Sequence, residues 1–355
     1  MALTKARVLL VGCGGIGTIA ALNLEAGGLA RVTAVLRSNF DIVNRKGFTI
    51  HSCEHGDKEG WRPTEGQFRY PRLLLAMSLI VIAMSLVSNT VPASANSDSN
   101  ISFDYVVCCT KNVPDAGPSL SDITAPAVTP GQTVIVLIQN GINIERPFFR
   151  RFKKNIVLSG VSRIDAHEHP PGVIEQKQPD LLHIGPFFNA YREWPEHEEA
   201  AQRFVEIYSA GGKTTCLYKE DVGLDRWSKL VYNASFNPIC ALTRVNASQL
   251  QTSSGSMDSL VIPAMKEVIK VAAAMGHDIP PIAITQAMQM NPIDENIKPS
   301  MQVDFDKGNL IEHENILGEV CRVAYQRGVA TPILEVLYQL CCAHQFSVKR
   351  DRGLA

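Results

Sequence analysis

The chain has 355 residues, of which 45% are hydrophobic and 19% are charged, and its formal net charge is −1. This length and composition are typical of a globular protein with two domains. The near-neutral charge removes the main electrostatic argument for nucleic acid or an anionic membrane as a partner.

The nine cysteines indicate a reducing compartment. Their number is odd and they include the adjacent pairs Cys108–Cys109 and Cys341–Cys342, so they do not form the pattern of a disulfide framework. The chain enters a strand pattern within its first ten residues, which leaves no room for a signal peptide. We therefore expect a cytoplasmic protein.

Residues 7–28 predict a strand, a tight turn and a helix that is closed by Gly27 and Gly28, and residues 31–38 predict a second strand. The turn has the pattern G-x-G-x-x-G and consists of Gly12, Cys13, Gly14, Gly15, Ile16 and Gly17. Glycines permit the turn and let the backbone approach a pyrophosphate, and the helix N-terminus offers free N–H groups to it. The motif predicts dinucleotide binding; the alternative is a purely structural turn.

The end of the second strand bears on which dinucleotide is bound. Proteins that bind NAD usually place an acidic residue about 20 residues after the glycines, where it bonds the ribose hydroxyl. Here that position holds Arg37, with Ser38 beside it, and a cation favours the 2′-phosphate of NADP. The alternative is that Arg37 is an ordinary surface residue and Asp41 binds the ribose.

An apolar run at 73–87 interrupts this pattern. It has 15 residues, fewer than the roughly 20 that cross a bilayer, and a span here would split the predicted sheet. We expect a buried or surface-packed helix, followed by a mobile Ser/Asn-rich loop over 88–102.

Further apolar strands are predicted at 103–111, 131–141, 155–163, 172–176 and 180–185. The first two of these are continuously apolar, which suits a parallel sheet that is buried on both faces. Lys111 and Asn140 end two of these strands, and ligands of such sheets lie beyond the carboxyl ends of the strands. Both residues are therefore candidate ligand contacts, unless they are ordinary loop residues.

Two histidine-containing segments are possible metal sites. His51, Cys53 and His55 alternate as they would along a strand, but no second ligand cluster accompanies them. The segment 167–169 is expected to be a solvated turn. No metal site is predicted.

After a helix at 196–212 and a strand at 213–219, the periodicity becomes purely helical. Helices are predicted at 221–237, 256–276, 280–290, 305–328 and 331–345. The sequence thus predicts an α/β domain over 1–220 and an all-helical domain over 221–355.

The first of these helices carries three polar residues in one stripe: Lys229, Asn233 and Asn237 are four residues apart. The stripe is either a solvated face or the wall of a polar site. Farther along lie Ser300, which is placed to cap a helix, Asp304 and Glu312.

Together these residues resemble the ketopantoate (2-dehydropantoate) 2-reductase family. The resemblance covers most of the chain and rests on "GCGGIG" from Gly12, Arg37, "VVCCTK" ending at Lys111, "QNG" around Asn140, "HIGP" at 183–186, "SKLVYNASFNP" at 228–238, Ser300 with Asp304, and Glu312. The lysine and two asparagines, combined with the later serine and glutamate, are specific, whereas the glycine motif alone is not. The insert at about 73–100 departs from the family, and the loop 163–178 matches it only loosely.

The resemblance implies a Rossmann-type domain followed by a helical domain like the C-terminal domain of 6-phosphogluconate dehydrogenase. It implies that the glycine turn and Arg37 bind NADP, that Lys111, Asn140 and Glu312 line the cofactor groove, and that Lys229 is the general acid. It further implies that Asn140, Asn233, Asn237 and Ser300 hold the substrate, and that Glu312 also approaches the reacting site.

The implied activity is NADPH-dependent reduction of 2-dehydropantoate to pantoate, in the pathway to pantothenate and coenzyme A. The alternatives are a related NADP-dependent oxidoreductase acting on another 2-oxo or 3-hydroxy acid, and a non-catalytic NADP sensor. The sequence leaves a homodimer open.

Overall fold

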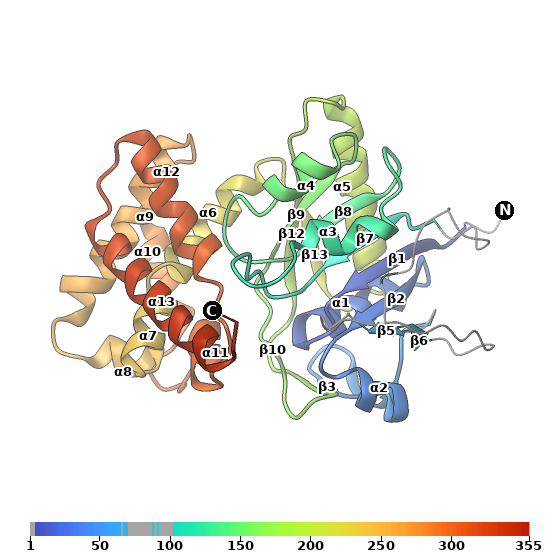
Figure 1. Cartoon of the computed structure of the whole chain (residues 1–355), viewed down its shortest axis with the longest axis horizontal. Helices are drawn as coiled ribbons and strands as arrows, with labels where there is room; N and C mark the ends of the chain where they lie inside the picture. The colour runs from blue at the N-terminus through green and yellow to red at the C-terminus, as the bar shows by residue number, and fades with distance from the viewer. Residues whose placement is uncertain (1–3, 65–66, 70–86, 89–90, 92–101, 355) are drawn as a thin grey trace. The chain divides into compact units, whose positions relative to one another are not determined.

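The computed structural model (Figure 1) describes residues 4–64, 67–69, 87–88, 91 and 102–354. The predicted helix at 73–87 and the predicted loop at 88–102 lie outside these residues, apart from a few positions. Within the described ranges, no helix is both long enough and apolar enough to cross a membrane.

The chain forms two compact units. Unit 1 consists of Met1–Thr110, Pro118–Gln139 and Glu145–Val222. Unit 2 consists of Lys111–Gly117, Asn140–Ile144 and Gly223–Ala355, so it takes two short loops from the first half of the chain.

Unit 1 is built on a nine-stranded sheet with the order β13-β12-β9-β8-β7-β1-β2-β5-β6. The strands are β1 Ala6–Val11, β2 Ala30–Leu36, β5 Gln67–Arg69, β6 Val87–Ser88, β7 Tyr105–Cys108, β8 Val134–Leu137, β9 Val157–Ser162, β12 Leu181–Phe187 and β13 Thr215–Tyr218. From β9 through β2 all neighbours are parallel, as predicted. One edge differs, because β12 runs antiparallel to β9.

A smaller sheet, with the order β10-β11-β3-β4, also belongs to unit 1. Its strands are β3 Phe48–Ser52, β4 Gly56–Trp61, β10 Ala166–Glu168 and β11 Val173–Gln176. The prediction of a solvated turn at 167–169 is therefore wrong. The alternation expected over 51–55 is also wrong: β3 ends at Ser52, and the ring of His55 bonds Asn23 Oδ1 at 2.7 Å.

The helices of unit 1 pack around these sheets; α1 contacts α5, β10 and β11. They are α1 Gly15–Ala26, α2 Phe40–Lys46, α3 Leu120–Thr124, α4 Arg146–Arg151 and α5 Trp194–Ser209, with a 3₁₀ turn at Ala125–Ala127. The predicted strand–turn–helix–strand over 7–38 is confirmed, and Gly27 is the C-cap of α1.

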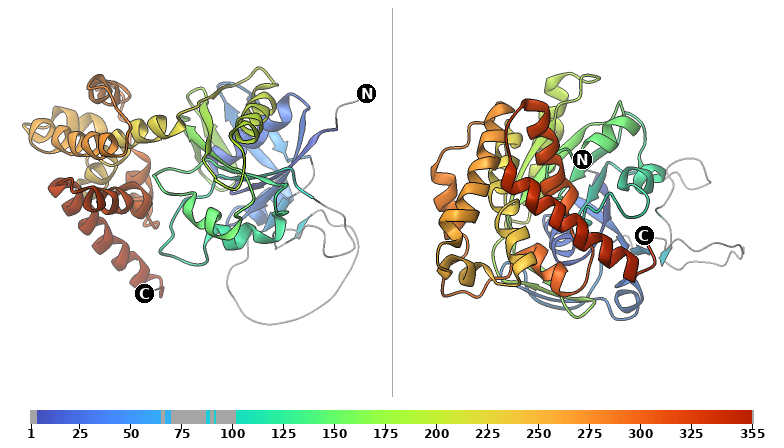
Figure 2. Two further views of the ribbon diagram at one scale, coloured as in Figure 1. Left: turned by 90° about the horizontal axis from the view of Figure 1, so that it is seen from above. Right: turned by 60° about the vertical axis from the view of Figure 1, so that its left-hand side comes forward.

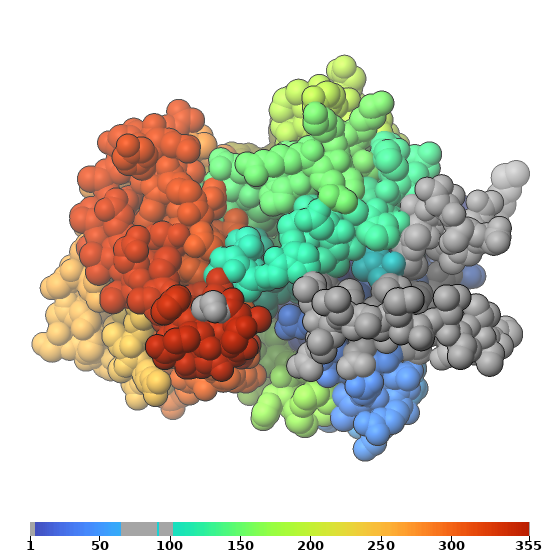
Figure 3. Space-filling model, in the orientation of Figure 1, coloured from blue at the N-terminus to red at the C-terminus, as the bar shows by residue number. Residues whose placement is uncertain are grey.

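Unit 2 is helical, as predicted. Its α-helices are α6 Val222–Asn233, α7 Phe236–Thr243, α8 Ala247–Thr252, α9 Ile262–Ala274, α10 Ile282–Gln289, α11 Ser300–Asp306, α12 Glu319–Arg327 and α13 Pro332–Asp351. Two π-helical turns, Met257–Val261 and Glu314–Gly318, lead into α9 and α12. The helix α13 packs on α7 and α9 and runs along the outside of the unit (Figures 2 and 3).

Three helix predictions in unit 2 are wrong in detail. The helix expected over 221–237 is broken at Ala234 and Ser235, because Pro238 lacks an N–H and its ring would clash with the carbonyl of Ala234. The helix expected over 305–328 is interrupted after α11, where Gly308 adopts a φ of +63°. Ser300 is the first residue of α11 and makes no capping hydrogen bond.

Candidate active site

The glycine turn after β1 has the geometry of a phosphate cradle. Gly12 has a φ of +95°, and a Cβ there would lie 2.6 Å from Thr110 Cγ2. A Cβ on Gly17 would lie 1.9 Å from the carbonyl oxygen of Gly12. At Gly14, by contrast, the nearest described atom would be Glu168 Oε2 at 3.8 Å, so this side of the backbone is open to a ligand. Packing demands the first and last glycines, and the middle one leaves room for a phosphate.

The start of α1 supplies hydrogen-bond donors at this cradle. Gly14 is the N-cap, and no side chain in the described part of the chain caps the helix. The first N–H groups and the positive end of the helix dipole therefore remain for an anion. Cys13 is buried, and burial raises the pKa of its thiol well above the ordinary value, so it does not serve as a thiolate.

Arg37 directly follows β2 and is exposed, as are Ser38 and Asp41. The sequence did not reveal that Asn39 and Glu168 lie beside the glycine turn. Asn39 Nδ2 donates to Cys13 O and to Glu168 Oε1, each at 2.7 Å. The same oxygen of Glu168 accepts the backbone N–H of Gly172 at 2.8 Å.

Unit 2 contains a second polar site, which joins four residues singled out from the sequence. Lys229 Nζ donates to Asn140 Oδ1 at 2.8 Å, and the Asn140 side chain also hydrogen-bonds Glu312. Glu312 Oε1 accepts the backbone N–H of Asn112 at 2.8 Å, and its Oε2 lies 3.8 Å from Lys111 Nζ. Lysine, amide, carboxylate and lysine thus form one connected network.

The two charged residues at the Lys111 end of this network have shifted pKa values. Lys111 Nζ also donates to Asp304 Oδ2 at 2.6 Å. Burial lowers the pKa of Lys111, but the carboxylates of Glu312 and Asp304 outweigh burial and raise it. For Glu312, burial raises the pKa and outweighs the opposing effects of Lys111 and the hydrogen bonds. The lysine therefore remains an ammonium, and Glu312 takes up a proton more readily than an ordinary glutamate.

Asn233 and Asn237 are both buried, but they do not lie on one helix as predicted. Asn233 ends α6, whereas Asn237 belongs to α7. Neither the Nδ2 nor the Oδ1 of Asn237 has a hydrogen-bond partner among the described residues. An unpaired buried amide costs about 1–3 kcal/mol, so this residue fits a site that hydrogen-bonds a ligand. Ser300 is exposed at the start of α11, one turn before Asp304.

Family models match both parts of the chain. The model of "Ketopantoate reductase PanE/ApbA" matches residues 8–189, and that of "Ketopantoate reductase PanE/ApbA C terminal" matches residues 221–345. The chain belongs to the ketopantoate reductase family. Like other ketopantoate reductase structures, it has an α/β domain followed by a helical one.

Individual relatives extend over nearly the whole chain. The uncharacterized protein YDL144C of Saccharomyces cerevisiae is 34% identical and aligns over 98% of this chain and 96% of its own length. The crystal structure of 2-dehydropantoate 2-reductase from Methylococcus capsulatus is 27% identical, covers 96% of this chain and 97% of its own, and has a TM-score of 0.75. D-mandelate dehydrogenase, solved with NADH and anilino(oxo)acetate, shares the fold with a TM-score of 0.74 at 18% identity, covering 97% of this chain and 99% of its own.

In this member of the ketopantoate reductase family, Asn140 is held by contacts that the sequence did not predict. Gly141 has a φ of +87°, and a Cβ there would lie 2.4 Å from Asn315 O. Arg226 Nη1 donates to Gly141 O at 2.8 Å in a buried contact. Asn315 Nδ2 donates to Ile142 O at 2.8 Å. The glycine of "QNG" was the one feature of the sequence that indicated a constrained backbone here. The residues that contact this segment lie far away in the sequence.

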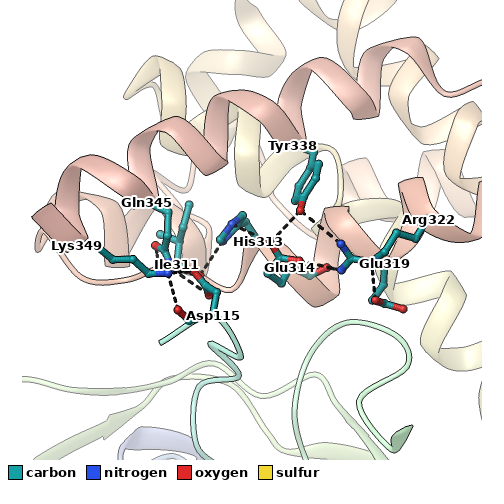
Figure 4. Close-up of polar contacts among 9 residues, drawn as sticks. All are labelled: Asp115, Ile311, His313, Glu314, Glu319, Arg322, Tyr338, Gln345 and Lys349. Carbon is teal, nitrogen blue, oxygen red and sulfur yellow. Dashed lines mark hydrogen bonds and ion pairs between the residues drawn. The ribbon is translucent and has the colours of Figure 1, made fainter. Parts of the chain in front are cut away.

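The segments that carry Lys111 and Glu312 are also tied together, through α13. The buried Gln345 accepts the N–H of Ile311 at 3.0 Å and donates to Asp115 Oδ2 at 3.2 Å. Lys349 pairs with the same aspartate (Figure 4). The C-terminal helix therefore holds the residue before Glu312 and the loop after Lys111 in fixed relation.

Proposed function

We propose that this protein reduces a 2-oxo acid to a 2-hydroxy acid with NADPH, and that the substrate is 2-dehydropantoate. The observation that carries the proposal is the network from Lys229 through Asn140 to Glu312 within unit 2. Membership of the ketopantoate reductase family and the likeness to a 2-dehydropantoate 2-reductase at 27% identity support the reaction class.

The glycine turn of unit 1 fits the pyrophosphate of a nicotinamide cofactor, which when bound would supply the hydride chemistry. Gly14 leaves the backbone open to the phosphates, and the uncapped start of α1 offers them N–H groups. The exposed guanidinium of Arg37 suits a 2′-phosphate and hence NADP. The same fold holds NADH in D-mandelate dehydrogenase, and the exposed Asp41 remains the alternative contact for the ribose.

Lys229 is assigned as the general acid. An ammonium within hydrogen-bond reach of the substrate carbonyl stabilises the alkoxide charge that develops there and delivers the proton. Asn140 accepts one hydrogen bond from Nζ and so fixes the direction of the ammonium group. Glu312 accepts a hydrogen bond from the same amide and so orients Asn140, and through it the ammonium group of Lys229.

Asn233, Asn237 and Ser300 are assigned to substrate binding. An amide both donates and accepts, so it can bond either a carboxylate or a hydroxyl of the substrate without adding charge. The assignment has its strongest support at Asn237, because both polar atoms of its amide are buried and have no hydrogen-bond partner in the described ranges. Hydrogen bonds to the substrate would remove the free-energy cost of burying an unpaired amide.

A related reaction on another 2-oxo or 3-hydroxy acid is the second candidate. The fold shared with a D-mandelate dehydrogenase that binds anilino(oxo)acetate favours it. The third candidate is a non-catalytic NADP sensor. The connected Lys229–Asn140–Glu312 network argues against a sensor, because cofactor binding alone does not require a proton donor.

Replacement of the lysine tests the assignment. Lys229→Ala should lower kcat about 10²–10⁴-fold, the range for loss of a general acid, while NADPH binding by unit 1 is retained. Lys270→Ala, which removes an exposed lysine on α9 of the same unit, is the matched control and should leave kcat unchanged. Equal turnover in the wild type and Lys229→Ala would show that another group donates the proton.

A further inference from the structure

A second cluster of reactive side chains lies in unit 2, outside the site described above. Within the described residues, His313, Glu314 and Cys342 are the group whose nitrogen, oxygen and sulfur atoms all lie within 4.8 Å of one another. His313 is nearly fully buried, and the other two are partly buried. No sequence pattern marks this cluster, since Cys342 belongs to α13 and the other two residues precede α12.

We propose that His313, Glu314 and Cys342 bind one divalent cation of the zinc class. Imidazole nitrogen, carboxylate oxygen and thiolate sulfur are the three ligand types that proteins use for Zn²⁺. Three protein ligands leave a fourth position, so the site is of the open kind. This proposal does not rest on the proposed function.

The direction of the histidine ring supports a cation here. His313 Nδ1 lies 3.3 Å from Ile311 O; a carbonyl only accepts, so Nδ1 carries the hydrogen. In the neutral ring, Nε2 then presents a lone pair. That atom lies 3.4 Å from Glu314 Oε1 (Figure 4). When the ring is protonated, these two atoms form an ion pair. In the neutral ring they face each other as electron-pair donors, and a metal cation between them would take the place of the proton.

The neighbouring side chains orient the carboxylate. Arg322 Nη2 donates to Glu314 Oε2 at 2.8 Å, which leaves Oε1 as the oxygen on the histidine side. Tyr338 Oη donates to Oε1 at 2.8 Å. Partners of this kind fix the orientation of metal ligands and tune metal affinity.

The charges also suit a divalent ion. Cysteine is mostly a thiol at neutral pH, so Cys342 carries a proton before a metal ion binds. A metal ion displaces that proton, because the thiolate is the ligand form. Thiolate and carboxylate then supply two negative charges, of which the charge of Glu314 is shared with Arg322. Bound metal would join α13 to the residues that follow Glu312, whereas Gln345 joins α13 to Ile311, the residue before it.

Cobalt(II) is the sharpest probe, because a thiolate bound to Co²⁺ gives charge-transfer absorption in the near ultraviolet. Titration of the full-length, reduced, chelator-treated protein with Co²⁺ should give this absorption, saturating at one ion per chain and abolished by Zn²⁺. Cys342→Ser should lose it. Cys53→Ser, which removes an exposed thiol of unit 1, is the control and should keep it.

A second variant keeps the test decisive if Cys342→Ser folds poorly. His313→Gln should weaken Zn²⁺ binding, measured by competition with a chromophoric chelator, by more than the roughly 10–100-fold that loss of an outer partner costs. Absence of the absorption in the wild type, its persistence in Cys342→Ser, or unchanged Zn²⁺ affinity in His313→Gln would each overturn the proposal.

Discussion

Replacement of Gly141 by alanine should both destabilise unit 2 and impair the network around Asn140. Gly141 has a φ of +87°, and an added Cβ would lie 2.4 Å from Asn315 O and 2.7 Å from Asn315 Cβ. Asn315 cannot move freely, because its backbone carbonyl accepts from Ile142 N and its side chain donates to Ile142 O. The chain must therefore shift at residues 140–142.

A matched control separates strain from steric overlap. Gly117 has a φ of +85° and belongs to the same unit, but no described atom lies within 4 Å of the position that a Cβ would occupy there. Both Gly→Ala changes carry the cost of a left-handed backbone, about 1–2 kcal/mol. Gly141→Ala adds an overpacking cost of about 1–3 kcal/mol. By these principles we expect about 1–2 kcal/mol for Gly117→Ala and about 2–5 kcal/mol for Gly141→Ala.

Tryptophan fluorescence can report on unit 2 alone. Trp227 is buried in the core of unit 2, and the other two tryptophans, Trp61 and Trp194, belong to unit 1. In a background with both of these changed to phenylalanine, urea unfolding followed by fluorescence measures the free energy of unfolding of unit 2. Gly141→Ala should also lower kcat about 10²-fold, because a displacement near 1 Å is that costly. Equal losses of stability in the two alanine variants would show that overlap with Asn315 adds no cost at Gly141.

Two further predictions concern unit 1. Arg37→Asp should shift the ratio of kcat/KM values toward NADH by at least about 10-fold, equivalent to about 1.4 kcal/mol, because a carboxylate repels the 2′-phosphate; a wild type that already prefers NADH would contradict this role. Burial, with Lys58 and Lys213, lowers the pKa of His55 from 6.5 to about 4, so the unfolded state binds more protons between these values and the free energy of unfolding falls as pH falls from about 6.5 to about 4. His55→Gln should remove that part of the pH dependence in urea titrations, and an unchanged slope would show that His55 is not its source.

The parts of the site that follow local rules were predictable from the sequence. The glycine turn between the strand and the helix was predictable because local geometry requires its glycines. Gly12 has a positive φ, and Gly17 packs too closely against the backbone to carry a side chain. Lys111 and Asn140 each lie three residues beyond the end of a parallel strand, so sheet geometry brings their loops to the same edge. These residues could be selected without knowledge of their partners.

The remaining parts depend on contacts between distant segments. Arg226, Asn315 and Gln345 position the network through hydrogen bonds to Gly141, Ile142 and Ile311, and no local pattern marks them. The prediction that Lys229, Asn233 and Asn237 lie on one helix was wrong. It did not take Pro238 into account, and Asn237 belongs to the next helix. The catalytic role of the lysine and the substrate-binding roles of the two asparagines remain predictions, which activity measurements must test.

The most direct test of the central claim is turnover of NADPH by the purified protein across a panel of 2-oxo acids that includes 2-dehydropantoate, pyruvate and phenylglyoxylate, with Lys229→Ala and Lys270→Ala measured alongside. We expect oxidation of NADPH with 2-dehydropantoate as the best substrate, near-complete loss of activity in Lys229→Ala and full activity in Lys270→Ala. Preference for another 2-oxo acid with the same dependence on Lys229 would retain the mechanism and change the substrate. Binding of NADPH without turnover of any 2-oxo acid would contradict the claim.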